Sequence, residues 1–415
     1  MKYGIIGKPL IHSFSKPIHE SLSSFSYEIN ELDSNEVSSL LKNRDFLGIN
    51  VTIPYKQFVI PFLDKIDEQA NRIHAVNTIV NRNNILYGYN TDYGGLKKMI
   101  LDHKMDINNK ICAILGNGGT HNTSYALLKD LGAKEIITAT RKKEKGTLTF
   151  DELIKRKDVE VIINTTPVGM YPNNYDRIIS LNDFPSLKYV VDVVYNPLRT
   201  PLVLEAKERG IIATGGLEML VNQAVIANEI FFSKKNDAEV YKSIYKNIYL
   251  NKSNVVLIGM PMAGKTTIGK VLAEALNKKF YDLDEEIEKR IPLPIKEYFE
   301  KYGESKFREI ENEITKEISK ETNLVISTGG GIIKNKENIF ALKENGYIVF
   351  LNRDDDLLIY DDKRPLTKNK EEYHKLLNER ITLYKKYCDI EIENNDSVKD
   401  TVTRIKEAFD ESFNY

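Results

Sequence analysis

Residues 259–266 read GMPMAGKT, which is the pattern G-x-x-x-x-G-K-[ST] of a loop that binds nucleotide phosphates. The apolar run NVVLIG precedes this loop and a helical pattern of apolar residues follows it, which is the context such a loop requires. Backbone N–H groups at the start of the helix would bind the phosphates, Lys265 would reach the β- and γ-phosphates, and the Thr266 hydroxyl would hold Mg²⁺. The stretch therefore predicts phosphoryl transfer from a nucleoside triphosphate.

Polar residues that could hold an acceptor follow the loop in several short stretches. In FYDLDEEIE two aspartates stand two residues apart, and in GESKFREIE an arginine precedes a glutamate by three residues. The triple glycine of VISTGGGI would let a ligand approach the backbone. Each stretch alone also fits a solvated turn or a surface ion pair, but their order behind a phosphate loop indicates an acceptor site. The residues concerned are Asp282, Asp284, Arg308, Glu311, Gly329, Gly330, Gly331, Arg364 and Arg380.

The first ninety residues contain a second set of candidates. Lys56 ends the run NVTIPYK, and Asp92 stands in YNTDYGG. A lysine beside an aspartate can protonate a carbonyl oxygen during hydride delivery, because the ammonium is the acid and the carboxylate orients it. Lys56 alone also fits a surface lysine. Ser13 and Ser15 of IHSFS and Asn77 of HAVNTIV could hold a polar substrate, although the serines could instead cap a helix.

A glycine turn in the same half of the chain suggests a dinucleotide. Gly116, Gly118 and Gly119 follow the strand-like run ICAIL and precede a helical pattern, although His121 stands where the third glycine of G-x-G-x-x-G would fall. The next run, EIITATR, leads into the basic residues 141–143 rather than an acidic residue. A basic cluster there suits a 2′-phosphate and hence NADP, whereas the alternative is a solvated basic turn.

The elements that must position these residues alternate along the chain. Apolar runs such as KICAILG, VEVIINTT, YVVDVVY, LVISTGG and YIVFLNR are separated by helix-length segments, which is typical of parallel α/β sheets. The runs fall into at least two sets, and the polar segment 233–254 lies between them. We therefore expect an α/β protein with its main domain boundary near residue 250.

The amino-acid composition indicates which kinds of molecule the protein binds. The 415 residues include 59 basic and 60 acidic side chains, with a formal net charge of −1, which argues against nucleic acid or an anionic membrane and favours small molecules. We find no signal-peptide pattern and no apolar stretch long enough to span a membrane. The two cysteines and six histidines show neither a disulfide framework nor metal-ligand spacing, so we expect a cytoplasmic protein. The sequence leaves the oligomeric state open.

From about residue 253 to its end, the chain resembles shikimate kinase. The resemblance implies that Asp282 assists Mg²⁺, that Asp284 holds the substrate hydroxyls and accepts the reacting proton, and that Arg364 closes on the transferring phosphoryl group. The family usually has glycine where this chain has Met262, so we expect altered loop dynamics but retained binding. Arg308 and Arg380 would clamp the substrate carboxylate. The remaining residues implied for the acceptor pocket and for ATP are Gly329, Gly330, Gly331, Gly259, Gly264, Lys265, Thr266 and Thr267.

Residues 1 to about 245 resemble shikimate dehydrogenase through the SFS pair, NVTIPYK, AVNT, NTD, NTTPVGM, DVVYNPLRTPL and EMLVNQA. The resemblance implies a catalytic dyad of Lys56 and Asp92. Two departures, His74 before AVNT and the turn Thr140-Arg141-Lys142, leave the cofactor affinity open. The residues implied for the substrate are Ser13, Ser15, Thr52, Asn77, Asp92, Tyr195 and Gln223, and those implied for NADP(H) are Gly116, Gly118, Gly119, Thr140, Arg141, Lys142, Thr165 and Met170.

The two resemblances divide the chain. Residues 1–92 would form the substrate domain of the dehydrogenase, completed by about 217–245, and residues 93–216 a Rossmann domain for NADP. Residues 246–252 would be a linker, and residues 253–415 a kinase domain of the P-loop NTPase type. The dehydrogenase site would lie in the cleft between its two domains.

The predicted function is bifunctional. NADPH would reduce 3-dehydroshikimate to shikimate, and ATP would then phosphorylate shikimate to shikimate 3-phosphate. Three alternatives remain: a quinate/shikimate dehydrogenase that uses NAD, a kinase for another small polyol, and an inactive ligand-sensing regulator. The basic run at 141–143 argues against the first, the acceptor residues against the second, and the retained lysines against the third.

Overall fold

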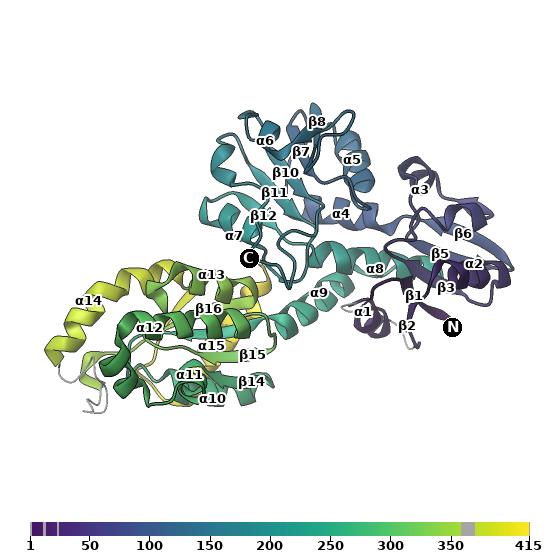
Figure 1. Ribbon diagram of the computed structural model, residues 1–415. Coiled ribbons are helices and arrows are strands. Elements are labelled where there is room, and N and C mark those ends of the chain that lie inside the picture. Colours follow the sequence, from purple (N-terminus) through teal and green to yellow (C-terminus); the bar gives the residue numbers. More distant parts are fainter. Residues whose placement is uncertain (1, 11–13, 23–24, 358–369, 415) are drawn as a thin grey trace. The chain divides into compact units, whose positions relative to one another are not determined.

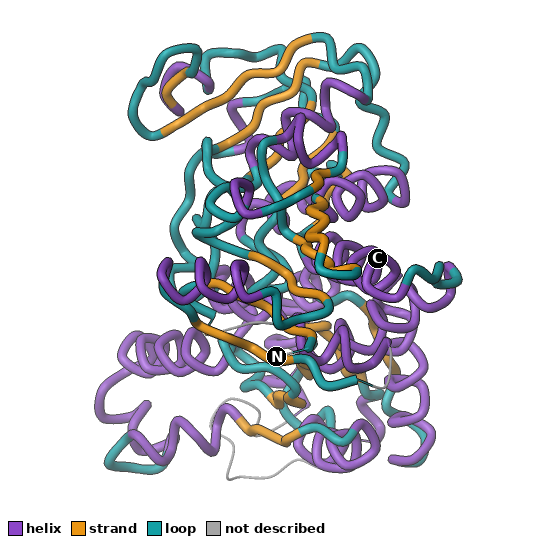
Figure 2. Tube along the Cα trace, turned by 90° about the vertical axis from the view of Figure 1, so that its right-hand side faces the viewer, coloured by secondary structure: helices purple, strands orange, loops and turns teal. Residues whose placement is uncertain are grey.

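The computed structural model describes residues 2–10, 14–22, 25–357 and 370–414 (Figures 1 and 2). The chain divides into two compact units, one of residues 1–196 with 200–246 and the other of residues 247–415 with 197–199. The first unit contains two sheets and the second contains one, counted over the described residues. Among the helices so described, none has the length and apolarity needed to cross a membrane.

The first sheet has the strand order β2-β1-β3-β5-β6-β4. Its pairs β1–β2, β1–β3 and β4–β6 are parallel, whereas β3–β5 and β5–β6 are antiparallel. The antiparallel hairpin arises because Asn83 and Asn84 both adopt positive φ, at 53° and 66°, which is the geometry of a tight type I′ turn. The strands are β1 Tyr3–Gly7, β2 Glu28–Glu31, β3 Gly48–Val51, β4 Lys65–Ile66, β5 Thr78–Arg82 and β6 Ile85–Tyr89.

Helices pack against this sheet, and two of them, α4 and α8, pack against each other. Asn90 follows β6 and caps the next helix, because its side chain accepts from the backbone N–H of Tyr93. The helix so begun, α4, lies against α8, and a Cβ on Gly95 would approach the Met219 carbonyl oxygen to 2.8 Å. Glycine therefore permits the two helices to meet backbone to backbone. The elements are α1 Ser15–Leu22, α2 Ser34–Asn43, η1 Ile60–Phe62, α3 Glu68–Ile73, α4 Thr91–Asp102 and α8 Leu217–Phe232.

The second sheet of the first unit has the order β12-β11-β10-β7-β8-β9, and all its strand pairs are parallel. In order of appearance this is 6-5-4-1-2-3, the doubly wound Rossmann order. Alternate residues of β7 point to opposite cores, Cys112 and Ile114 to one and Ala113 and Leu115 to the other, which is why the strand reads as a continuous apolar run. The elements are β7 Ile111–Leu115, α5 His121–Asp130, β8 Glu135–Thr140, β9 Leu148–Thr149, α6 Phe150–Leu153, β10 Val161–Asn164, η2 Leu181–Asp183, β11 Tyr189–Asp192, α7 Pro201–Glu208 and β12 Ile212–Thr214.

The second unit is built on a parallel sheet of order β14-β15-β13-β16-β17. Apolar clusters cover both faces, with Val256 and Ile258 of β13 on one face and Val255 and Leu257 on the other. The elements are β13 Asn254–Ile258, α10 Lys265–Leu276, β14 Lys279–Asp282, α11 Leu283–Arg290, α12 Ile295–Ile318, β15 Leu324–Ser327, η3 Ile332–Lys334, α13 Lys336–Asn345, β16 Gly346–Asn352, η4 Asp355–Leu357, α14 Lys370–Tyr387, β17 Ile390–Glu393, α15 Val398–Glu411 and η5 Ser412–Asn414.

The boundary between the units falls inside a helix. Helix α9, Ala238–Lys252, includes residues 246–252, the segment predicted as a linker. The polar, lysine-rich and asparagine-rich composition of this segment is therefore that of a helix with solvated positions. The strand that follows, β13, starts two residues after the helix ends.

Candidate functional sites

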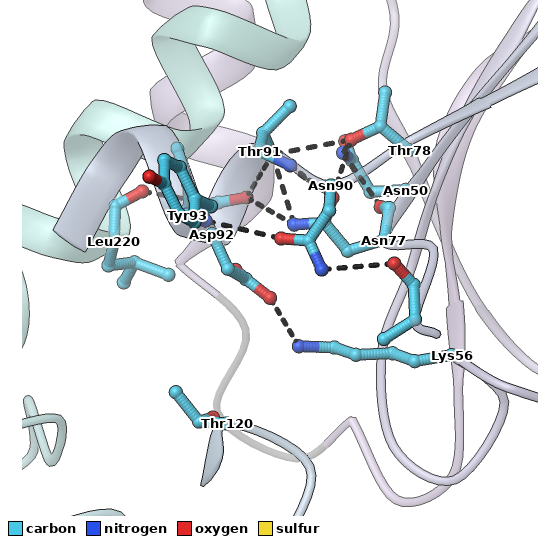
Figure 3. Close-up of polar contacts among 12 residues, drawn as sticks. Asn50, Lys56, Asn77, Thr78, Asn90, Thr91, Asp92, Tyr93, Thr120 and Leu220 are labelled. Carbon is cyan, nitrogen blue, oxygen red and sulfur yellow. Dashed lines mark hydrogen bonds and ion pairs between the residues drawn. The ribbon is translucent and has the colours of Figure 1, made fainter. Parts of the chain in front are cut away.

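The lysine and aspartate singled out in the first ninety residues form an ion pair. Lys56 lies in the turn after β3, and Asp92 lies in the first turn of α4; the Lys56 Nζ to Asp92 Oδ2 distance is 2.6 Å (Figure 3). The exposed fractions of the two side chains are 16% and 11%. The pair is thus shielded but open to a ligand, and its ammonium group is oriented by a single carboxylate.

A network of amides and hydroxyls lies beside this pair. The backbone N–H of Thr91 donates to Asn77 Oδ1 at 2.7 Å, and Asn77 Nδ2 donates to Thr91 Oγ1 at 3.0 Å (Figure 3). Gln223 of α8 joins them, because its Oε1 accepts from Thr91 Oγ1 at 3.3 Å. The structure therefore brings together Asn77, Asp92 and Gln223, three residues expected to bind substrate, from the residue before β5, from α4 and from α8.

Other predicted substrate residues approach from the first strand ends and from the second sheet. The backbone N–H of Thr52 donates to the Ile6 carbonyl oxygen at 3.0 Å, which fixes it at the end of β3 beside β1. Ser15 is buried at the start of α1. Tyr195, in the segment after β11, packs edge-on against Phe14 with ring centroids 5.3 Å apart. Ser13 lies outside the described residues.

Sequence reasoning did not single out the buried polar side chains behind this network. Asn50 Nδ2 donates to Thr78 Oγ1 at 3.0 Å and Tyr27 donates from its hydroxyl to Asn50 Oδ1 at 2.6 Å. Thr78 and Thr91 have hydroxyl oxygens 3.3 Å apart. Asn50, Thr78 and Thr91 all belong to the short motifs NVTIPYK, AVNT and NTD, so the signal was a polar residue inside an otherwise apolar strand end.

The glycine turn after β7 has the shape of a phosphate cradle. Gly116 has a φ of +91°, and a Cβ there would lie 2.6 Å from Thr166 Cγ2. A Cβ on Gly118 or Gly119 would meet no atom within 4 Å. His121, which replaces the third glycine, begins α5 and contacts Thr138 Oγ1 through Nε2 at 2.8 Å. Open backbone at a helix start fits a pyrophosphate.

The basic run lies at the end of the neighbouring strand, β8. Lys143 donates to Glu152 at 2.5 Å, whereas Arg141 and Lys142 are exposed. Thr140 is buried, and its hydroxyl donates to the Lys142 carbonyl oxygen at 2.7 Å, which shapes the turn. Two exposed cations beside the cradle fit a 2′-phosphate.

Thr165 and Met170 lie in the segment after β10, at the point where the strand order reverses between β7 and β10. The Thr165 hydroxyl donates to the Leu115 carbonyl oxygen at 2.8 Å, so this residue is fastened to the end of β7. Met170 has an exposed fraction of 42%. Ligands of doubly wound sheets bind at such a reversal.

In the second unit, the phosphate loop joins β13 to α10. Gly259 and Gly264 have φ values of +149° and +87°, and a Cβ on Gly259 would lie 2.5 Å from the Leu351 carbonyl oxygen. Lys265 Nζ donates to the Gly259 and Met260 carbonyl oxygens, both at 2.9 Å. Met262 adopts a φ of +69°, which is a left-handed conformation in a residue other than glycine.

A hydroxyl and a carboxylate lie together at the start of α10. The Thr266 hydroxyl donates to Asp282 Oδ2 at 2.8 Å, and Thr267 follows on the exposed side of the helix. In the described part of the chain no three His, Cys, Asp or Glu side chains are grouped as metal ligands. A hydroxyl and one carboxylate nevertheless fit Mg²⁺, which keeps several waters and takes further oxygens from phosphates.

Each glycine of the triple-glycine turn faces a predicted acceptor residue. A Cβ on Gly329 would lie 2.7 Å from Asp284 Oδ1, and one on Gly330 would lie 3.4 Å from Arg380 Nη1. A Cβ on Gly331 would collide with the guanidinium of Arg308. Glycine fits this turn because Asp284, Pro261 and Arg308 leave too little room for a Cβ; at Gly330 the nearest atom is Pro261 Cδ, at 2.9 Å from where a Cβ would be.

The charges of this pocket are largely buried. Arg308 Nη1 donates to Glu311 Oε2 at 2.7 Å, and Glu311 is fully buried. Burial, and then the charge of Asp282, raise the pKa of Asp284 above its usual value. Arg380 donates to the Gly330 carbonyl oxygen at 2.8 Å, while its Nε and Nη2 are buried without a hydrogen-bond partner among the described residues.

The two Arg380 nitrogens that have no partner among the described residues, Nε and Nη2, fit a carboxylate ligand. Tyr384, which the sequence did not single out, donates to the same Gly330 carbonyl oxygen at 2.5 Å. Arg364 lies outside the described residues.

Comparisons with known proteins match both halves of the chain. Residues 5–79 match the family model of the shikimate dehydrogenase substrate binding domain, and residues 261–410 match that of shikimate kinase. The shikimate dehydrogenase (NADP(+)) of Clostridium beijerinckii is 37% identical over 262 residues, which are 59% of this chain and 96% of that protein. That of Methanosphaera stadtmanae is 34% identical over 273 residues, 58% of this chain and 94% of that protein.

Solved structures give the same result. A chorismate mutase/shikimate 5-dehydrogenase fusion protein from Clostridium acetobutylicum is similar with a TM-score of 0.57 at 36% identity, over 59% of this chain and 96% of that one. Shikimate 5-dehydrogenase from Thermus thermophilus, in complex with NADP(H) and shikimate, has a TM-score of 0.54 at 27% identity, over 60% and 99%. The chain belongs to the shikimate dehydrogenase family and carries a shikimate kinase domain at its C-terminal end, so it is a bifunctional enzyme of the shikimate pathway.

Proposed function

We propose that residues 1–245 reduce 3-dehydroshikimate to shikimate with NADPH, and that residues 253–415 phosphorylate shikimate with ATP and Mg²⁺. The observation that carries the proposal is the shielded pair of Lys56 and Asp92, 2.6 Å apart, beside amides and hydroxyls from three elements. A pair of this kind suits the reduction of a carbonyl group in a molecule rich in hydroxyls.

In the first reaction the protein supplies a proton and the cofactor, when bound, supplies a hydride. The Lys56 ammonium donates its proton to the carbonyl oxygen of the substrate, which becomes the new hydroxyl group. Asp92 holds the ammonium in place and stabilises its charge. Asn77 and Gln223 bind the hydroxyl groups of the ring, because an amide can both donate and accept. Ser15, Thr52 and Tyr195 complete the substrate site, and the role of Ser13 is carried over from the family resemblance.

The residues that would hold the cofactor lie at the carboxyl ends of the second sheet. The open backbone of Gly118 and Gly119 would bind the pyrophosphate, and Arg141 and Lys142 would bind the 2′-phosphate. Thr165 and Met170 would flank the nicotinamide. Thr140 holds the basic turn in shape through its bond to the Lys142 carbonyl oxygen.

In the second reaction ATP with Mg²⁺ supplies the phosphoryl group. Lys265, which donates to two loop carbonyls in the structure, would bind phosphate oxygens instead, and Thr266 with Asp282 would hold the metal. Asp284 accepts the proton of the attacking hydroxyl, a role that its raised pKa favours. Arg308 and Arg380 hold the substrate carboxylate, which distinguishes shikimate from a polyol without one. The role of Arg364 at the transferring group is carried over from the family resemblance.

A single mixture tests both halves: full-length protein, 3-dehydroshikimate, NADPH, ATP and Mg²⁺, with the products followed by mass spectrometry. We expect shikimate 3-phosphate. The Lys56→Ala variant should leave 3-dehydroshikimate unreduced but should phosphorylate added shikimate. The Lys265→Ala variant should reduce 3-dehydroshikimate but should leave the shikimate unphosphorylated. Each variant controls for the folding of the other half. Loss of both activities in either variant, or unchanged reduction by Lys56→Ala, would contradict the proposal.

A further inference from the structure

Asp192 is a buried carboxylate that neither reaction uses. It ends β11 with none of its side chain exposed. Burial raises its pKa to about 6, while hydrogen bonds from Thr200, Val194 and Asn164 oppose that rise. A buried charge is costly unless hydrogen bonds compensate it, and a polar group retained at that cost calls for a reason.

Three donors converge on this carboxylate. Oδ1 accepts from Asn164 Nδ2 and from the backbone N–H of Val194, both at 3.0 Å. Oδ2 accepts from the Thr200 hydroxyl at 2.6 Å. Both oxygens of a carboxylate accept hydrogen bonds, so Asp192 can accept from all three donors. An asparagine would instead turn its NH₂ group toward at least one of these donors.

One of the bonds reaches the cofactor turn through Asn164. Because Asn164 presents Nδ2 to Asp192, its Oδ1 faces the other way and accepts from Thr166, at 3.0 Å from N and 2.7 Å from Oγ1. Thr166 Cγ2 in turn abuts Gly116, 2.6 Å from where a Cβ would be. The carboxylate thus fixes the orientation of an amide, and the amide fixes the segment between Thr165 and Met170.

The other two hydrogen bonds of Asp192, to Val194 and Thr200, hold the segment that carries Tyr195 at both of its ends. Val194 immediately precedes Tyr195, and Thr200 caps α7 by accepting from the Val203 backbone N–H at 3.4 Å. The Tyr171 backbone N–H donates to the Asn196 carbonyl oxygen at 3.1 Å, which ties this segment to the one after β10. The segment after β10 and the segment after β11 therefore both depend on one buried group.

We propose that Asp192 is a positioning residue for NADP(H): it touches no ligand, but it sets the two segments and the glycine turn against which the nicotinamide end binds. The inference rests on the proposed function of residues 1–245. It assigns cofactor binding, rather than substrate binding or fold stability alone, to a residue outside the ligand shell.

The test compares Asp192→Asn, Thr200→Val and the matched control Thr200→Ser in the full-length chain. NADPH fluorescence gives the dissociation constant without turnover, and steady-state kinetics give KM for 3-dehydroshikimate. We expect the NADPH dissociation constant to rise on the order of tenfold in Asp192→Asn and Thr200→Val, since each loses a hydrogen bond to a charged group. KM for 3-dehydroshikimate should rise by a smaller factor than the NADPH dissociation constant, because of the substrate residues only Tyr195 lies in a segment bonded to Asp192. Thr200→Ser should resemble wild type, and the kinase activity of the same chain should be unchanged.

An unchanged NADPH dissociation constant together with a lower melting temperature would overturn the inference and leave Asp192 a structural role only. A rise confined to KM for 3-dehydroshikimate would also overturn it. Should Asp192→Asn fail to fold, Thr200→Val carries the test alone. If wild type binds NADPH but does not reduce 3-dehydroshikimate, the proposed function fails while the comparison of dissociation constants still decides the role of Asp192.

Discussion

At the scale of single residues, burial in the acceptor pocket raises the pKa of Asp284, the proposed general base. Asp284 lies beside Gly329 and near a second carboxylate, Asp282, and both burial and that neighbouring charge favour its neutral form. A carboxyl group with a raised pKa is a stronger base once ionised. This difference fits the proposed roles, in which Asp284 accepts the proton and Asp282, which accepts from Thr266, would hold the metal.

The pH dependence of the kinase follows from this shift. A general base works ionised, so kinase kcat/KM should fall as pH is lowered through the pKa of Asp284, at a pH above the usual 3.8 of an aspartate. Asp284→Asn should lose roughly a hundredfold or more of the activity. The measurement is a pH profile of both proteins, with the dehydrogenase activity of each sample as the folding control. If the residual activity of Asp284→Asn falls at low pH as the wild-type activity does, then the fall is caused by the titration of another group.

Met262 offers a second test at this scale. Its φ of +69° strains a residue with a Cβ, and its side chain packs against the core of the second unit. Met262→Ala keeps the strain and loses the packing, whereas Met262→Gly loses both. We expect the glycine variant to be the more stable of the two by about 1 kcal/mol, against the usual order in which alanine exceeds glycine. Urea unfolding of the full-length variants, followed through kinase activity, measures the difference in stability. A Met262→Ala variant more stable than Met262→Gly would show that Met262 is not strained.

At the scale of elements, helices α3, α4 and α5 are tied by one aspartate. Asp130, at the end of α5, accepts from Tyr93 Oη at 2.6 Å and from Arg72 Nη1 at 2.9 Å. Tyr93 directly follows Asp92 along α4. The bond therefore steadies the helix turn that carries one half of the catalytic pair, from a helix that begins at the cofactor turn.

Removing the Tyr93 hydroxyl should show this. Tyr93→Phe should lower the free energy of unfolding of the first unit by about 1 kcal/mol, the ordinary worth of one such bond, or somewhat more because its acceptor is charged. Tyr125→Phe, at an exposed position on α5, is the matched control. Chemical denaturation followed through dehydrogenase activity is the measurement, and equal stabilities of the two variants would mean that the bond contributes nothing.

At the scale of the whole molecule, two compact units with separate cores predict two unfolding transitions. NADP⁺ should raise only the transition of the first unit, and ATP with Mg²⁺ only that of the second. At a ligand concentration one hundred times the dissociation constant, the gain is about 2.7 kcal/mol. Differential scanning calorimetry with each ligand alone makes the comparison. A shift of both transitions by one ligand would reveal coupling between the units.

Much of this organisation could be predicted from the sequence. Parallel strands buried on both faces read as unbroken apolar runs, so the Rossmann and phosphate-loop sheets were readable from composition along the chain. The hairpin of β5 and β6 was not predicted, although the pair Asn83-Asn84 between two strand-like runs is its local signal. The proposed catalytic pair of Lys56 and Asp92 was predictable in type, since the proposed chemistry requires it, but its separation of 2.6 Å depends on two elements that meet only in the fold.

Buried polar residues escaped prediction for a different reason. Asn50, Thr78 and Asp192 each stand at a strand end, where a polar residue usually meets solvent, and only their surroundings show that they are enclosed. A hydrogen bond to a residue more than twenty positions away, such as that from Asn50 to Thr78, leaves no periodic trace. Positioning residues are therefore harder to predict than the groups they position.

The triple-glycine turn has a consequence for inhibitors. A compound bound in the kinase acceptor site would rest on bare backbone at residues 329–331. Any side chain there would collide with Asp284, with Pro261 or with Arg308, the groups that shape the pocket for its natural ligand. Mutations that shield the kinase from such a compound at these three positions would disable it as well, so resistance would have to arise elsewhere in the pocket.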